Sequence, residues 1–249
     1  TIYNSRTLVE NCAYVNILRN KVINTTSTAD IRGIQVLTYG DVGISEYCRV
    51  SDNDIITKSE FAIHVASYAI DQDPSKPNNI TRNITVENNI IKAPLGIRLQ
   101  VSTGCVIKNN TITTDTPDGF SMTISYSEFA VIESNTMDLT NNAWFGVGLE
   151  DYPSFSFGGT KPELSYNSIV NNTVVSDGTG GGLTPDGLTY GFYLYSAVDG
   201  LAKYNTFLRN EASNFVIGFT DLNDVFGTYP LSTSFINNIA NCNTYNFVS

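Results

Sequence analysis

Charged side chains are scarce in this chain, because Asp, Glu, Lys and Arg together make up only 15% of its 249 residues. Acidic residues outnumber basic ones by 24 to 14, and the formal net charge at pH 7 is −10. This balance argues against nucleic acid or an anionic membrane surface as a partner. No apolar run approaches the roughly 18 residues of a transmembrane helix, so we expect no membrane span.

Histidine and cysteine, the usual zinc ligands, are also rare. The single histidine is His64, and the four cysteines show neither a Cys-x-x-Cys motif nor a Cys/His spacing, so no metal site is expected. Cys48 and Cys105 occupy the same place in the repeat described next, where a small buried residue is needed. We therefore predict core thiols there, and we expect all four cysteines to react with thiol reagents only after unfolding.

The chain does contain an internal repeat, which reads apolar residue, two residues, Asn, one residue, apolar residue. Subtracting 89 from 110 gives the shortest step, 21 residues, which is close to one coil of a β-helix; longer steps are interpreted as coils with loop insertions. Clear copies centre on Asn20, Asn53, Asn89, Asn110, Asn135 and Asn172, and weaker copies on Asn205 and on Asn237 or Asn238.

Two short strands joined at the Asn explain this repeat. Apolar residues at period two point into a core, and Asn tolerates the left-handed conformation that a bend between strands needs. Stacked Asn side chains can hydrogen-bond to one another from coil to coil. We therefore interpret the Asn row as structural rather than catalytic, and we predict burial of the apolar residues that follow it, namely Ile55, Ile91, Ile112, Met137 and Val174.

A second strand precedes each Asn, and no long amphipathic helix separates the strands. These strands are expected at 33–36, 62–65, 96–99, 121–124, 146–149, 191–194 and 216–219. The sequence therefore predicts an all-β fold, a right-handed parallel β-helix (a solenoid) of about eight coils. We expect one domain over residues 1–249, taken or processed from a longer chain.

These repeats resemble the right-handed parallel β-helices of the pectin-lyase-like superfamily, which includes pectin and pectate lyases, polygalacturonase-type hydrolases, alginate-modifying enzymes and bacteriophage tailspikes. The resemblance implies polysaccharide binding in a groove along one sheet, an extracellular or virion-surface location and, for a tailspike, a homotrimer. Catalytic signatures of these families are missing: residues 116–119 and 184–187 only echo Asn-Thr-Asp-Gly, and His64 lies in Ile-His-Val. No catalytic residue is therefore transferred from any one family.

Coil-to-coil stacking aligns the outward residues of the second strand in two columns, with neighbours about 4.8 Å apart. Long insertions at 151–165 and 177–188 are expected beside them, where they could wall a groove. The first predicted column is Gln35, His64, Arg98, Thr123, Gly148, Tyr193 and Gly218. The second is Leu37, Ala66, Gln100, Ser125, Glu150, Tyr195 and Thr220.

This face suggests two chemistries. A hydrolase needs two carboxylates, and the predicted catalytic candidates are Glu150, Asp151 and Asp186. A lyase would use Arg98 and His64 and could require Ca²⁺, although the net charge of −10 disfavours an anionic substrate. The expected substrate-binding residues are Arg98, His64, Tyr193, Tyr195 and Gln100. Hydrolysis is slightly favoured, and the alternative is a noncatalytic β-helix, an adhesin or a tailspike shaft whose acids are ordinary solvated side chains.

Overall fold

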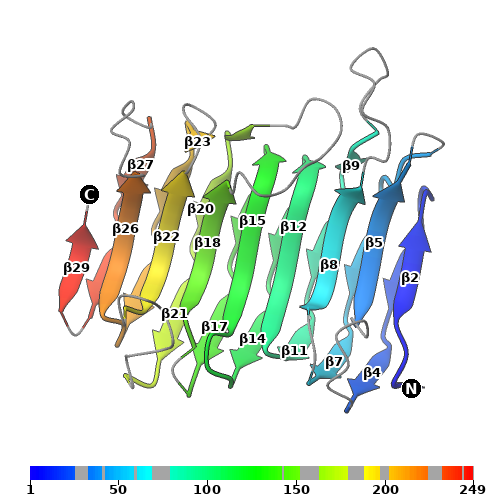
Figure 1. Cartoon of the computed structure of the whole chain (residues 1–249), viewed down its shortest axis with the longest axis horizontal. Coiled ribbons are helices and arrows are strands. Elements are labelled where there is room, and N and C mark those ends of the chain that lie inside the picture. The colour runs from blue at the N-terminus through cyan, green and yellow to red at the C-terminus, as the bar shows by residue number, and fades with distance from the viewer. Residues whose placement is uncertain are drawn as a thin grey trace.

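The computed structural model describes residues 1–25, 33–40, 43–58, 61–68, 79–141, 143–151, 163–178, 188–196, 202–223, 232–242 and 244–248. Every regular element in these ranges is a β-strand. The strands stack into three long parallel sheets, and the two termini lie at opposite ends of the stack (Figure 1). This part of the chain is a parallel β-helix, as the repeat predicted.

Sheets A and C contain the short strands on either side of the repeated Asn. Sheet A consists of β1 (Ile2–Tyr3), β4 (Lys21–Asn24), β7 (Asp54–Thr57), β11 (Ile90–Lys92), β14 (Thr111–Thr114), β17 (Thr136–Leu139), β21 (Thr173–Ser176), β25 (Glu211–Ser213) and β28 (Ile239–Asn241). Sheet C consists of β3 (Asn16–Leu18), β6 (Arg49–Ser51), β10 (Thr85–Glu87), β13 (Val106–Lys108), β16 (Val131–Glu133), β20 (Ser168–Val170), β24 (Thr206–Leu208) and β27 (Ser234–Ile236).

Sheet B contains the long strands, which face the viewer in Figure 1. It consists of β2 (Thr7–Glu10), β5 (Ile34–Tyr39), β8 (Phe61–Tyr68), β12 (Leu95–Thr103), β15 (Phe120–Glu128), β18 (Phe145–Asp151), β22 (Tyr190–Ser196), β26 (Ile217–Asn223) and β29 (Tyr245–Val248), with β9 (Thr81–Arg82) paired to β12. A two-stranded sheet is formed by β19 (Leu164–Ser165) and β23 (Ala202–Lys203). A typical coil runs through sheets C, A and B in turn, as in β13, β14 and β15.

One hydrophobic core fills the space between the three sheets. Ile112 pairs with Ile91 on one side and with Met137 on the other, so side chains of similar size stack directly upon one another. The predicted burial is confirmed, because Ile55, Ile91, Ile112, Met137 and Val174 are all at most 1% exposed.

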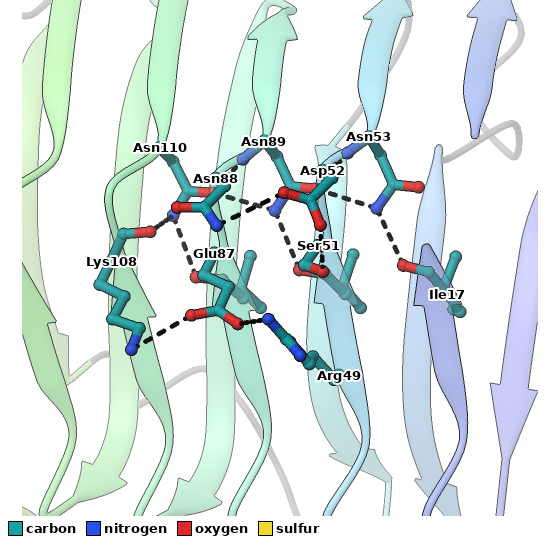
Figure 2. Close-up of polar contacts among 12 residues, drawn as sticks. Ile17, Arg49, Ser51, Asp52, Asn53, Glu87, Asn88, Asn89, Lys108 and Asn110 are labelled. Carbon is teal, nitrogen blue, oxygen red and sulfur yellow. Dashed lines mark hydrogen bonds and ion pairs between the residues drawn. The ribbon is translucent and has the colours of Figure 1, made fainter. Parts of the chain in front are cut away.

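The predicted Asn ladder is present at the corner between sheets C and A (Figure 2). Nδ2 of Asn89 donates a hydrogen bond to Oδ1 of Asn110 at 2.9 Å, and the backbone N–H of Asn89 donates to the same oxygen at 3.0 Å. Nδ2 of Asn89 also donates to the carbonyl oxygen of Val50 in the preceding coil. The ladder runs through Asn20, Asn53, Asn89, Asn110, Asn135, Asn172, Asn210 and Asn238.

Two details of the ladder prediction are wrong. The ladder Asn does not adopt the left-handed conformation, because its side chain and its N–H are both held in the ladder. The preceding residue adopts it instead, as at Arg19, Asp52, Asn88, Asn109, Ser134, Asn171, Arg209 and Asn237. Asn205 is also not a member. It accepts hydrogen bonds from Asn167 in a second ladder where sheet B leads into sheet C, whereas Asn210 continues the first.

The cysteines follow the repeat only in part. Cys48 and Cys105 are 2% and 1% exposed, which confirms their predicted burial. Cys12 is exposed and Cys242 is partly exposed, so the expectation that all four thiols are shielded is wrong. Neither residue occupies the repeat position of Cys48, which in the first coil is held by Val15.

Candidate functional site

The outward face of sheet B, from β5 to β26, carries the two predicted columns. The first column runs through Gln35, His64, Arg98, Thr123, Gly148, Tyr193 and Thr220. The second runs through Leu37, Ala66, Gln100, Ser125, Glu150, Tyr195 and Leu222. Both columns agree with the prediction in every strand before β26.

The prediction is wrong at β26 by two residues. Ile217 pairs with Tyr190 and Phe219 with Phe192, so Thr220 takes the place expected for Gly218. A shift of two residues leaves the same side chains pointing inward, Phe219 among them. The alternation of apolar residues therefore cannot distinguish the predicted pairing of β26 from the observed one. The shift also places Asp221 opposite Leu194, a fully buried core residue.

Most side chains in the columns are outward-facing and yet buried. Gln35, His64, Gln100, Thr123, Ser125, Tyr193 and Thr220 are each at most 2% exposed, and Glu150 is 7% exposed. Arg98 and Tyr195 are half-buried. This face therefore differs from an ordinary solvated sheet surface, and its polar groups lie in a low-dielectric environment where hydrogen bonding matters more.

The predicted binding residues contact one another across neighbouring strands. Nε2 of His64 lies 3.3 Å from Oε1 of Gln100, one coil along. The guanidinium carbon of Arg98 lies 5.1 Å from the centre of the Phe61 ring, a cation–π distance. His64 and Gln100 thus contact each other, whereas Arg98, which pairs with His64 in the sheet, lies against Phe61.

Glu150 lies on β18, two strands beyond Arg98 in the sheet. The hydroxyl of Thr123 donates a hydrogen bond to its Oε2 at 3.1 Å, which orients the carboxylate back towards β15. Asp151 ends β18 and pairs with Ser196, but its side chain lies outside the described part of the structure. Asp186 also lies outside the described residues. Glu150 is thus the one predicted catalytic carboxylate whose surroundings are described.

An aromatic cluster lies on the same outward face, separate from the core of the coils. Phe145, Tyr190, Tyr193 and Ile217 form it, with Trp144, Phe120 and Tyr195 packed against them. The Tyr193 ring lies 4.7 Å from that of Phe145, and a Cβ at Gly148 would meet Tyr193 at 2.5 Å. The missing side chain at Gly148 gives the Tyr193 ring its space, so Tyr193 is a packing residue as well as a predicted binding residue.

Four buried side-chain oxygen atoms of the two columns find no hydrogen-bond partner among the residues that the structure describes. They are Oε1 of Gln35, Oγ of Ser125, the hydroxyl of Tyr193 and Oγ1 of Thr220. Leaving a buried polar atom unpaired costs about 1–3 kcal/mol, so folded proteins rarely tolerate several together. Several such atoms are thus concentrated on the outward face of sheet B. The sequence shows which residues face outward but not which of them lack partners.

Asp221 is a titratable residue that the sequence reading missed. Burial raises the pKa of its carboxyl group to about 6, and its Oδ1 has no hydrogen-bond partner among the described residues. The alternation Phe219-x-Asp221 in the sequence already indicated an inward direction for Asp221, since a shift of two residues leaves that direction unchanged. The residue faces inward near the last coil, away from the outward columns.

No family model matches the chain, and no curated protein matches its sequence. The described residues include no helix that is long and apolar enough to cross a membrane. Nor do they bring together three or more His, Cys, Asp or Glu side chains in a position to hold a metal ion. The fold thus defines the class, a parallel β-helix, and the outward face of sheet B defines the candidate site.

Proposed function

We propose that the outward face of sheet B binds a polysaccharide and that Glu150 takes part in its hydrolysis. The observation that carries this proposal is the set of four buried, outward-facing polar atoms without partners. A sugar chain presents hydroxyl groups at short intervals and can satisfy such atoms, and the neighbouring aromatic cluster supplies apolar surface. Likeness of fold to the pectin-lyase-like superfamily supports the same substrate class, an extracellular or virion-surface location and membership of that superfamily.

Hydrolysis is favoured over elimination because the best placed reactive group is a carboxyl group. Glu150 is nearly buried and is oriented by Thr123, as a glycosidase acid must be. Asp151 and Asp186 are the candidates for the second carboxylate. A lyase would instead need His64 as the base and Arg98 or Ca²⁺ to neutralise an acidic substrate. The side chain of His64 is held against Gln100 and Phe61, which leaves it less suited to that role.

The test is incubation with a panel of plant and bacterial polysaccharides, with reducing ends and the absorbance of unsaturated products measured together. Reducing ends without the absorbance indicate hydrolysis, and both together indicate a lyase. Glu150→Gln should lower cleavage by at least about 100-fold while glycan binding stays within about threefold. Glu133→Gln on sheet C is the matched control and should leave both unchanged. Loss of binding and cleavage together would make Glu150 a contact residue, and full activity would remove it from the mechanism.

A noncatalytic rod is the second candidate, favoured by the near-complete burial of the columns. Side chains packed to this degree can serve a structural shaft, as in an adhesin or a tailspike, which by resemblance would be a homotrimer. Binding without any cleavage across the panel, together with a trimeric mass in solution, would favour this candidate over the hydrolase.

A further inference from the structure

A hollow of about 320 Å³ opens where three successive coils pass from sheet A to sheet B. Its volume is at the lower end of the roughly 300–1,000 Å³ that is usual for small-molecule sites. It lies apart from the outward columns of sheet B. The residues that line it include Ile56 and Lys58 from the end of β7, Lys92 and Pro94 from the end of β11, and Asp115 and Thr116 after β14.

The walls of this hollow are fixed by backbone hydrogen bonds between coils. The N–H of Lys58 donates to the carbonyl oxygen of Asn24 at 3.0 Å, and the N–H of Phe120 donates to that of Pro94 at 3.2 Å. A tight turn ties Gly119 to Thr116 at 3.1 Å. Because the frame is already formed, a ligand can enter without reordering the chain, which lowers the cost of binding.

Positive charge and a hydroxyl donor gather in the hollow. Nζ of Lys92 lies 3.1 Å from Oδ2 of Asp115, whereas Lys58 makes no ion pair within the described chain. Oγ1 of Thr116 is shielded from water and finds no hydrogen-bond partner in the described part of the chain. Two ammonium groups against one carboxylate leave a local charge of +1 in a chain whose net charge is −10.

We propose that this hollow binds one oxyanion group, a phosphate or a carboxylate, carried by a small molecule. Lys58 donates to the anion, and Lys92 is shared between the anion and Asp115. Ile56 and Pro94 contact the apolar part of the ligand. Asp115 therefore competes with the ligand for Lys92, and this competition gives the proposal its sharpest test.

The test is a titration of the whole chain with inorganic phosphate and, separately, with acetate, at constant ionic strength set with NaCl. Backbone amide shifts of the lining residues, followed by NMR, should saturate with at least one of the two anions. Saturation with phosphate alone identifies a phosphate site, saturation with acetate alone a carboxylate site, and saturation with both a general oxyanion site. All three results support the proposal.

Variants distinguish a preformed binding site from general electrostatic attraction of the anion. Lys58→Gln should weaken binding about two- to fivefold, and Asp115→Asn should strengthen it by a similar factor. Lys21→Gln is the control, because Lys21 pairs with Asp54 on the same sheet outside the hollow, and it should change nothing. The proposal is overturned if neither anion gives saturable shifts, or if Lys58→Gln and Lys21→Gln have equal effects.

Discussion

At the scale of the residue, a ladder Asn uses its whole side-chain amide. The two N–H groups of Asn110 Nδ2 donate to Oδ1 of Asn135 and to the carbonyl oxygens of Val86 and Lys108, so that one hydrogen is shared between two acceptors. Its Oδ1 accepts from both the side chain and the backbone of Asn89. The side chain is 1% exposed, so water cannot replace a lost bond. No other residue of this size offers both donors and an acceptor in this geometry.

Removing a central ladder Asn should therefore be costly. Asn110→Ala is expected to lower the free energy of unfolding by about 2–3 kcal/mol, because it leaves buried partners on both sides unpaired. Asn238→Ala, in the last rung of the ladder, should cost less than about 1 kcal/mol, since that rung is partly open to water. Urea denaturation measures both. Equal losses would contradict the dependence on burial.

The thiols should differ in reactivity according to their burial. Burial raises the pKa of Cys105 to about 11, so almost no thiolate exists at neutral pH. Cys12 is exposed, and we expect it to be the first cysteine to react with maleimide in the native protein. Mass spectrometry after timed labelling checks this, with Cys12→Ser as the control that removes the fast phase. Rapid native labelling of Cys105 would contradict its place in the core.

Asp221 should make stability depend on pH. Burial raises the pKa of its carboxyl to about 6 from an ordinary 3.8, so the folded state holds its proton more tightly than the unfolded state does. Its contribution to stability is full below about pH 4 and is lost as pH rises towards about 6. Asp221→Asn should remove this slope and raise stability at pH 7 by on the order of 1 kcal/mol, since partial contact with water reduces the effect. Denaturation of both proteins from pH 4 to pH 8 measures it. Parallel curves would contradict the assignment.

At the scale of the element, sheet C combines an inward apolar row with an outward ion cluster. Glu87 on β10 lies between Arg49 on β6 and Lys108 on β13, with Nζ of Lys108 at 3.1 Å (Figure 2). Glu87 is only 7% exposed, whereas both cations remain in contact with water. The strands are thus joined from outside by charge and from inside by stacked aliphatic side chains.

The inward stack should dominate the stability of these strands. Ile107→Ala on β13 is expected to cost about 2–5 kcal/mol, because it removes buried methyl groups and leaves a cavity. Glu87→Gln should cost less than about 1.5 kcal/mol, because Arg49 and Lys108 can be hydrated once the carboxylate is gone. Chemical denaturation compares the two variants. A larger loss for Glu87→Gln would show that the ion cluster, rather than the stack, holds the sheet.

At the scale of the whole molecule, each coil contacts only its neighbours, so stability is expected to vary along the stack. The last coil exposes large apolar side chains, with Phe247 53% and Ile239 63% exposed, although the Phe247 ring stacks on Phe219. Hydrogen exchange should therefore be slowest in β14 to β16 and fastest in β1 to β3 and β27 to β29. Uniform protection along the stack would instead indicate that all the coils open as one unit.

The sequence by itself determined the parallel stack, the inward rows and most of the Asn ladder. Every coil imposes the same demands, an apolar side chain at Ile112 and its equivalents and an amide at Asn110 and its equivalents, so the pattern recurs along the chain. The outward residues Gln100 and Glu150 followed from alternation in the strands. These features are local, and they therefore leave a periodic signal.

Only the tertiary structure decided the features that depend on what lies against a residue. The place of Thr220 beside Tyr193 followed only from the observed pairing of β26 with β22. Two pairings that differ by two residues agree equally well with the alternation in the sequence. The burial of outward Ser125 and Tyr193, the missing partners of their hydroxyls and the exposure of Cys12 depend on packing by distant parts of the chain. The hollow beside Lys58 is likewise formed by three separate coils. Periodicity specifies which face a side chain takes, but not what covers that face.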